Sequence, residues 1–294
     1  MKATKKIWLA IISSAALIVA VPGLARAGGT PSGPHHSYAP SPSSSRHALP
    51  RAHPSRVFRS HPLVRGTKFS TIASNNWSGF AAFGDHFRFI TVTYSIPSLN
   101  CAISPDGSFD SEWAGLDGFT TKTLEQIGTF AFCSGGTPNY FAFLEMVPSP
   151  AVSFTGVNPG DSVTASVFFS NSKWRLELVD NTTQGVITQT LPCPSGSTCR
   201  NANAEVISEV PNGGPPAASL ADYGIVGFTQ IAITDSAGHR FNFFSPNWSN
   251  DKIFEVNSSN SDLMQAPSKL EGSESGTGGG WGNQAFTDTA IAPN

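Results

Sequence analysis

The first 84 residues of this 294-residue chain contain no aspartate or glutamate, although they hold 10 of its 18 lysine and arginine residues. The rest of the chain carries all 20 acidic residues against 8 basic ones, a net charge of −12 (8 − 20). The total of −2 is therefore an average over a basic leader and an acidic body. Such an asymmetry indicates two segments with different fates.

Long apolar runs are also missing, with one exception at the N-terminus. Three lysines precede the apolar run Ile7–Val21, and the small residues of Ala25–Ala27 follow it. The run is short for a bilayer span, and its charge, length and exit motif are typical of a secretory signal peptide. We therefore expect residues 1–27 to be removed after Ala27, and the protein to be secreted without a stable membrane anchor.

Residues 28–70 lack acidic side chains and are rich in proline and serine, and five of the chain's seven histidines lie there. A segment of this composition cannot bury enough apolar surface to fold alone. One interpretation is a disordered spacer; the other is a propeptide whose cations pair with carboxylates of the body. The charge asymmetry favours the propeptide, which we expect to be cut between Ser60 and Ser74. The mature domain is then residues 71–294.

The body is poor in the side chains that most hydrolases use. It retains only two histidines, His86 and His239, and neither lies in a recognisable serine- or cysteine-nucleophile motif. A Ser-His-Asp triad needs a positioned imidazole, so the sequence argues against that class. The Asp-Thr/Ser-Gly pair of pepsin-like enzymes and the His-Glu-x-x-His motif are absent as well. Carboxylates and amides remain as candidate catalytic groups.

The body contains four cysteines and no Cys-x-x-Cys pair, which argues against a zinc site. An even number of cysteines in an exported protein predicts disulfides. Cys193 and Cys199 are close enough to close a tight loop, which leaves Cys101 to pair with Cys133. Four Asn-x-Ser/Thr sequons begin at Asn76, Asn181, Asn247 and Asn257.

No sustained helical period occurs after residue 70. The body contains instead β-branched and aromatic runs bounded by Gly, Pro, Asn or Ser, which predict strands. These runs are Phe87–Pro97, Leu124–Cys133, Tyr140–Pro148, Ser162–Ser170, Trp174–Val179, Val186–Leu191, Tyr223–Thr234 and Phe286–Ala290. Asn181–Gly185 is typical of a hairpin turn between two of them. Short strands at this spacing predict an all-β sandwich.

The run Ala204–Pro211 (AEVISEVP) is the densest candidate for chemistry. Side chains alternate along a strand, so Glu205, Ile207 and Glu209 share one face, while Val206 and Val210 face a core. Two carboxylates in apolar surroundings are partly desolvated, which raises the pKa of a glutamate toward use as an acid or base. The alternative is a solvent-facing strand with ordinary charges.

A second candidate is Ser111–Gly118 (SEWAGLDG), followed by Leu124–Gly128 (LEQIG). Trp113 and Asp117 share a face if the first segment is a strand. Gln126 is an amide within a largely apolar strand, and a buried amide must find hydrogen-bond partners. A purely structural role for this glutamine is the alternative.

Four motifs occur in the order of one known family. Asn76-Trp77-Ser78-Gly79 resembles its opening Asn-Trp-x-Gly, and the two segments above resemble Trp-x-Gly-x-Asp-Gly…Gln-x-Gly. Tyr140-x-x-x-x-Glu145-x-x-Pro148 and the run at Ala204–Pro211 complete the pattern of the glutamic peptidases, or eqolisins, which are acid-active secreted endopeptidases. The resemblance covers about residues 74–286 and implies a concanavalin-like β-sandwich of two antiparallel sheets with a concave cleft.

The resemblance implies that Gln126 and Glu205 are the catalytic pair. In this mechanism, a glutamate activates water and later protonates the leaving amine, while the amide of the glutamine stabilises the oxyanion. Neither a metal nor another cofactor is needed. Glu145 and Glu209 are secondary candidates, and Trp113 and Asp117 are expected to support the cleft.

The fungal members of that family carry tryptophan where this chain has Phe143, Met146 and Val206, so a less aromatic cleft is expected. We expect protein or peptide substrates, the chain's own basic propeptide as a partner, no nucleic acid, and a monomer. Two other classes stay open. A lectin-like sandwich would bind carbohydrate without turnover, and a glycoside hydrolase would use two carboxylates at a fixed separation.

Overall fold

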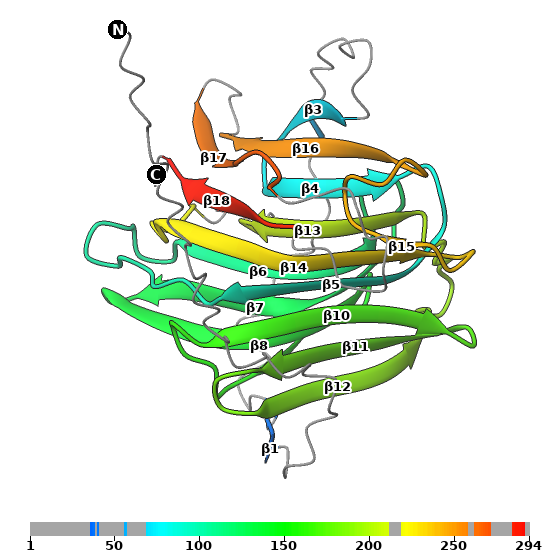
Figure 1. Cartoon of the computed structure of the whole chain (residues 1–294). Helices are drawn as coiled ribbons and strands as arrows, with labels where there is room; N and C mark the ends of the chain where they lie inside the picture. Colours follow the sequence, from blue (N-terminus) through cyan, green and yellow to red (C-terminus); the bar gives the residue numbers. More distant parts are fainter. Residues whose placement is uncertain are drawn as a thin grey trace, which may run out of the picture. The chain divides into compact units, whose positions relative to one another are not determined.

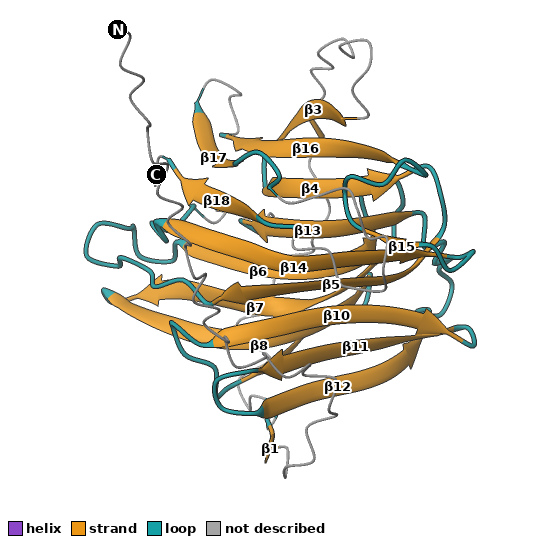
Figure 2. Cartoon of the chain, viewed as in Figure 1, coloured by secondary structure: helices purple, strands orange, loops and turns teal. Residues whose placement is uncertain are grey.

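The structure is a computed structural model that describes residues 36–38, 40, 56–57, 69–211, 219–257, 262–271 and 284–291. The expected signal peptide, most of the basic segment and the glycine-rich stretch after Glu271 lie outside these residues. Every regular element in the described part of the chain is a strand (Figure 2). No helix there is long and apolar enough to cross a membrane.

The strands are β1 (His36–Ser37), β2 (Arg56–Val57), β3 (Phe69–Ser74), β4 (Trp77–Phe83), β5 (Phe87–Ser95), β6 (Phe109–Asp117), β7 (Leu124–Ser134), β8 (Thr137–Val147), β9 (Val152–Phe154), β10 (Ser162–Ser170), β11 (Lys173–Asp180), β12 (Gly185–Pro192), β13 (Asn203–Glu209), β14 (Ile225–Asp235), β15 (Arg240–Phe241), β16 (Ser249–Val256), β17 (Leu263–Pro267) and β18 (Phe286–Ala290).

These strands form two layers (Figure 1). The first sheet has the order β9-β8-β7-β6-β13-β4-β16-β3, and β2 pairs with β3. The second has the order β12-β11-β10-β5-β14-β18, with β1 beside β12 and β15 beside β14. Strand β17 pairs with both β16 and β18 and so connects the layers. All pairs are antiparallel except β3–β16 and β1–β12.

The main core lies between the sheets and contains Ala114, Leu116 and Ile127 of the first sheet with Val92 and Leu176 of the second. A second apolar cluster covers the outer face of the first sheet, where Trp77, Trp113, Phe130, Phe143 and Ile207 pack together. The first sheet is therefore buried on both faces, as the unbroken burial of β13 indicates. Its outer face carries the candidate catalytic residues.

The expected β-sandwich is confirmed, and the predicted segments are found with small shifts at their ends. Strand β10 matches its predicted range Ser162–Ser170 residue for residue, whereas β8 begins at Thr137, three residues before Tyr140. The hairpin of β11 and β12 forms around the predicted turn. Both predicted disulfides, Cys101–Cys133 and Cys193–Cys199, are present.

The expected domain boundary at residue 71 falls inside strand β3, which begins at Phe69 and pairs with β16. Two described pieces of the basic segment also join the sheets: β1 pairs with β12, and β2 pairs with β3. The ion pairs Arg175–Glu177 and Asp235–His239 lie within the body. The pairing of the basic segment's arginines with carboxylates of the body stays a prediction.

Candidate active site

The strand register aligns the candidate pair across the first sheet. Glu205 of β13 lies opposite Gly115 of β6, Gly115 lies opposite Gln126 of β7, and Gln126 lies opposite Glu145 of β8. Directly opposed residues in antiparallel strands point to the same face. Glu205 and Gln126 are therefore two strands apart, at a backbone separation of about 10 Å, with a residue without a side chain between them.

Glu205 is fully buried, and neither oxygen of its carboxyl group has a hydrogen-bond partner among the described residues. Burial raises the pKa of Glu205 well above its usual range, and the charges of Asp117 and Glu125 raise it further. The backbone amide of Phe119 opposes this shift but lies outside hydrogen-bonding geometry. A carboxyl group in such surroundings holds its proton more strongly than one in water, which makes it a candidate for acid–base chemistry.

Gln126 is oriented by its neighbour in the row. Its Nε2 donates a hydrogen bond to Glu145 Oε2 at 2.7 Å, and both side chains are buried. Its Oε1 has no hydrogen-bond partner in the described part of the chain. Because the amide nitrogen carries two hydrogens, this hydrogen bond fixes the side chain and leaves a second donor for another oxygen.

Glu209 lies on the same face as Glu205 but is held quite differently. Asn76 Nδ2 donates to Glu209 Oε1 at 3.0 Å, and Trp113 Nε1 donates to Glu209 Oε2 at 2.9 Å. Burial nonetheless raises the pKa of Glu209 to about 8. Both oxygens are occupied by structural donors, which supports a positioning role for Glu209 and the expected supporting role of Trp113.

Asn76 is a residue that sequence reasoning quoted in a motif but did not assign to the site. It is fully buried and bonded to Glu209, so its sequon has no room for a sugar. Glu125 was missed as well, although it directly precedes Gln126 and its charge acts on Glu205. The available signal was membership of the opening motif for Asn76 and adjacency to Gln126 for Glu125.

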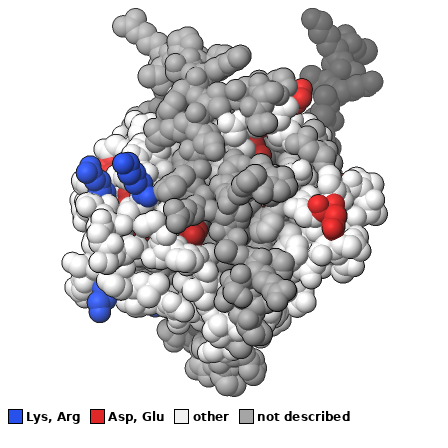
Figure 3. Space-filling view, turned by 180° about the vertical axis from the view of Figure 1, so that it is seen from behind, with Lys and Arg blue, Asp and Glu red and all other residues white. Residues whose placement is uncertain are grey.

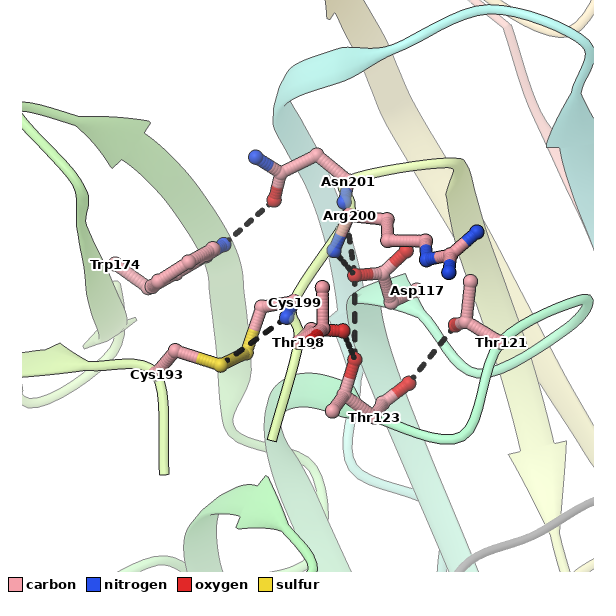
Figure 4. Close-up of a disulfide and its surroundings, with 9 residues drawn as sticks. All are labelled: Asp117, Thr121, Thr123, Trp174, Cys193, Thr198, Cys199, Arg200 and Asn201. Atoms are coloured by element: carbon pink, nitrogen blue, oxygen red, sulfur yellow. Dashed lines mark hydrogen bonds between the residues drawn. A yellow bond between two sulfur atoms is a disulfide. The ribbon is translucent and has the colours of Figure 1, made fainter. Parts of the chain in front are cut away.

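Asp117 closes the end of β6 next to the disulfide loop (Figure 4). Its Oδ2 accepts the backbone N–H groups of Arg200 at 2.6 Å and Asn201 at 2.8 Å, and its Oδ1 accepts that of Ala202 at 2.7 Å. These bonds fix the segment that leads into β13, and therefore the position of Glu205. Asp117 thus holds the backbone that leads to Glu205, and its supporting role in the site stays a prediction.

A pocket of about 680 Å³ opens beside this loop. It is lined by Thr120–Thr123, Pro148, Gly196–Thr198 and Arg200. Thr120 donates from both its backbone N and its hydroxyl to Asn203 Oδ1, at 2.8 and 2.9 Å. Asn203 precedes Glu205 by two residues on the same face of β13, so this pair of hydrogen bonds ties one wall of the pocket to the strand that carries Glu205.

The row itself is closed to solvent in the full-length chain. Gln126, Glu145, Glu205 and Glu209 are each at most 2% exposed. From the side opposite to the view of Figure 1, few charged side chains reach the described surface (Figure 3). In this structure the four side chains are therefore out of contact with solvent.

Two predicted contributors to the cleft point elsewhere. Met146 and Val206 lie in the core between the sheets, because they alternate with Glu145 and Glu205 along their strands. Of the three positions compared with the fungal proteins, only Phe143 packs on the outer face. The expectation of a less aromatic cleft is therefore wrong for Met146 and Val206, whose differences affect the core instead.

A second group of carboxyls lies between the sheets and was not found from the sequence. Asp110, Glu112, Glu255 and Asp288 are all buried. Burial raises the pKa of Glu112 to about 7 and that of Asp288 to about 8, and the pKa values of Asp110 and Glu255 lie well above their usual range. The alternation of Asp110 and Glu112 with Trp113 was the signal that could have placed the first two on the inner face.

Fold and site together define a β-sandwich with a buried carboxyl–amide centre on one sheet. Residues 75–275 match the model of the Peptidase A4 family. Aspergillopepsin-2 of Aspergillus niger is 27% identical over 182 residues, and scytalidopepsin B of Scytalidium lignicola is 32% identical over 146 residues. The matches cover 55% and 48% of this chain, and the chain spans 64% and 54% of the length of these relatives.

The fold is similar to that of scytalido-glutamic peptidase, solved with a peptide-based transition-state analogue. The TM-score is 0.55 at 21% identity, and the match covers 74% of this chain and 98% of the other. This chain belongs to the Peptidase A4 family. The resemblance to the glutamic peptidases is thereby confirmed.

Proposed function

We propose that this protein is a secreted, acid-active endopeptidase that hydrolyses peptide bonds with Gln126 and Glu205. The observation that carries the proposal is the row in which an unpartnered, buried Glu205 lies across Gly115 from an oriented Gln126. A structural glutamate would be expected to have hydrogen-bond donors, as Glu209 has. Membership of the Peptidase A4 family supports the same assignment.

The reaction begins with Glu205 as a carboxylate. It takes a proton from a water molecule whose oxygen attacks the carbonyl carbon of the scissile peptide bond. The resulting oxyanion accepts a hydrogen bond from Gln126 Nε2, which is already aimed by its bond to Glu145 Oε2. The carbon–nitrogen bond then breaks as Glu205 returns its proton to the leaving amine. All bonds and protons balance within the two residues, the water and the peptide.

The remaining site residues position this pair. Glu145 fixes the amide of Gln126, and Asp117 fixes the backbone that leads to Glu205. Trp113 and Glu209 form a hydrogen-bonded unit beside them. The removal of Glu145 should therefore affect catalysis through the orientation of Gln126.

An acidic medium suits a glutamate that serves as base and then as acid. A free glutamate titrates near pH 4.3, and burial raises the pKa of Glu205 in the closed site. Entry of water opposes that rise, because it restores solvation to the carboxylate. The working pKa is then brought back toward the acidic range, where both protonation states are populated.

We also propose that the basic N-terminal region keeps the enzyme latent. The charge asymmetry supports this role, and so does the burial of the whole row in the full-length chain. Two pieces of the region meet the first sheet near its opposite edges, with Pro40 bridged to Phe154 of β9 and β2 paired with β3. Secretion would follow from the signal-like sequence of residues 1–27.

The assay that tests the function compares substrate classes. The processed protein is incubated at acidic pH with a denatured protein and, separately, with a panel of polysaccharides. We expect peptide-bond cleavage that persists with chelators and with serine- and cysteine-directed reagents. Turnover of a polysaccharide would identify a glycoside hydrolase, and carbohydrate binding without any turnover would identify a lectin. Strong inhibition by a chelator would contradict the proposed mechanism.

A further inference from the structure

A tyrosine of the basic segment occupies a slot between the edges of the two sheets. Gly156 follows β9, an edge strand of the first sheet, and Gly185 begins β12, an edge strand of the second. A Cβ atom on Gly156 would lie 2.4 Å from Cδ1 of Tyr38, and one on Gly185 would lie 2.3 Å from its Cε2. The ring therefore fills the space that side chains at these two positions would take.

The hydroxyl end of the slot is a hydrogen-bonded chain with a defined direction. Tyr38 donates to Asp180 Oδ2 at 2.7 Å and lies 2.8 Å from Thr183 Oγ1. Despite burial, the backbone N–H of Thr183 and the hydroxyl of Tyr38 keep the pKa of Asp180 below its usual range. An ionised Asp180 only accepts, so Tyr38 uses its one hydroxyl hydrogen in the bond to Asp180. The Thr183 hydroxyl must therefore be the donor in its hydrogen bond with Tyr38. The N–H of Gly185 completes the chain by donating to Thr183 Oγ1 at 3.3 Å.

The backbone around Tyr38 is bound at both ends. His36 and Ser37 pair in parallel with Gly185 and Val186 of β12. Pro40 forms an antiparallel bridge with Phe154. The added strand and the side-chain slot are the two components by which an edge strand recognises an extended peptide.

We propose that this slot is a binding site for a tyrosine-bearing extended peptide, and that its ligand is the segment at residues 36–40 of this chain. The site holds the segment on the body by packing of the tyrosine ring and by hydrogen bonds. It does so whether or not the chain between the segment and the body has been cut. The proposal rests on the proposed separation of the N-terminal region from the body but not on the catalytic pair. Its contacts involve no lysine or arginine of the described residues, so the binding should resist salt, unlike pairing between surface charges.

Gly185 supports a role beyond core packing. Its backbone is in a conformation that other residues adopt, and glycine weakens a strand. The three atoms nearest to a Cβ at this position all belong to Tyr38. Accommodation of the tyrosine is therefore the observed reason for glycine at the start of β12, and Gly185→Ala blocks the slot selectively.

The test uses the full chain carrying Tyr38→Ala, which vacates the slot. A fluorescent peptide with the sequence of residues 33–43 should bind it, and binding should be largely unchanged between low and 0.5 M salt. The same peptide with Phe at the tyrosine position should bind about tenfold more weakly or worse, because a hydrogen bond to a charged acceptor is lost. Gly185→Ala, added to the Tyr38→Ala chain, should abolish binding. Gly227→Ala serves as the matched control, because a Cβ there meets no atom within 4 Å.

Equal binding to the wild-type and Tyr38→Ala chains would overturn the proposal, as would binding that survives Gly185→Ala or ignores the loss of the hydroxyl. Should Tyr38→Ala fail to fold, hydrogen exchange in the otherwise unmodified chain provides a second measurement. The backbone amides of residues 36–38 should exchange fast in Gly185→Ala and stay protected in Gly227→Ala. Equal protection in the two variants would also overturn it. Both measurements report binding and not catalysis, so they give the same result in an inactive enzyme. Failure of the slot proposal can therefore be distinguished from failure of the proposed function.

Discussion

Two glycines shape the outer face of the first sheet at the level of single residues. Gly115 separates Glu205 from Gln126, and a Cβ there would lie 2.9 Å from the side chains of Leu124 and Trp113. Gly128 lies one row further along, opposite Trp113. A Cβ on Gly128 would lie 2.0 Å from the backbone oxygen of Glu112, which cannot move aside as a side chain would.

We predict that Gly128→Ala destabilises the fold by about 1–3 kcal/mol or more, because the added methyl group forces β6 and β7 apart. Gly227→Ala is the matched control on β14, where a Cβ has open space. It should stay within about 0.5 kcal/mol of the wild type. Urea denaturation of both variants provides the comparison, and equal midpoints would contradict the packing argument.

At the scale of elements, the segment between the Cys193–Cys199 disulfide and β13 determines where Glu205 lies. Asp117 receives three backbone N–H groups from this segment on its two oxygens. An asparagine in its place has a single acceptor oxygen and an amide group that repels an N–H donor. The segment would then contain at least one unpaired buried donor.

We predict that Asp117→Asn costs about 1–3 kcal/mol of stability. The change also removes a negative charge that raises the pKa of Glu205. The pKa of Glu205 should fall, and the acidic limb of the kcat/KM profile should move to lower pH. Thermal denaturation and a pH–rate profile measure the two effects. An acidic limb that moves to higher pH would show that Asp117 does not act on the base in this way.

At the scale of the whole molecule, the four carboxyls between the sheets couple folding to pH. Their pKa values in the folded state are raised, to about 7 for Glu112 and about 8 for Asp288, whereas unfolded carboxyls titrate near 4. The folded state therefore binds more protons between these limits. The contribution of these carboxyls to the free energy of unfolding is therefore fully present below about pH 4, and it is lost as the pH rises toward 8.

We predict a melting temperature that is highest near pH 3–4 and decreases steadily toward pH 8. Glu112 contributes to this loss together with its neighbour Asp110, because burial raises the pKa of both carboxyls, that of Glu112 to about 7. Glu112→Gln should therefore flatten the curve, whereas Glu177→Gln, at a partly exposed position beside Arg175, should not. A melting temperature that rises from pH 4 to 8 would contradict the account.

The alternation of side chains predicted faces and cores, but it could not predict which residues lie opposite one another. Strand β10 was predicted in full because its residues alternate between buried and less buried positions. Strand β16 was missed because Asp251, Lys252 and Glu255 make its sequence polar, although it is largely buried. The row from Glu205 to Glu145 depends on the register of four strands. Strands β6, β7 and β8 follow one another through short turns, but β13 comes after four further strands, and no local signal places it beside β6. The motif order identified its members, and only the fold placed Gly115 between them.

The central claim is that Gln126 and Glu205, and not Glu209, are the reacting pair. The most direct measurement is kcat/KM for a peptide substrate at acidic pH in Glu205→Gln, Gln126→Ala and Glu209→Gln, with circular dichroism to verify the fold. Loss of one oxyanion donor typically costs about 10²–10³ in rate, and loss of the only base should cost at least as much. We predict that the first two variants lose activity to this extent and that Glu209→Gln is much milder. An inactive Glu209→Gln together with a nearly wild-type Glu205→Gln would contradict the account.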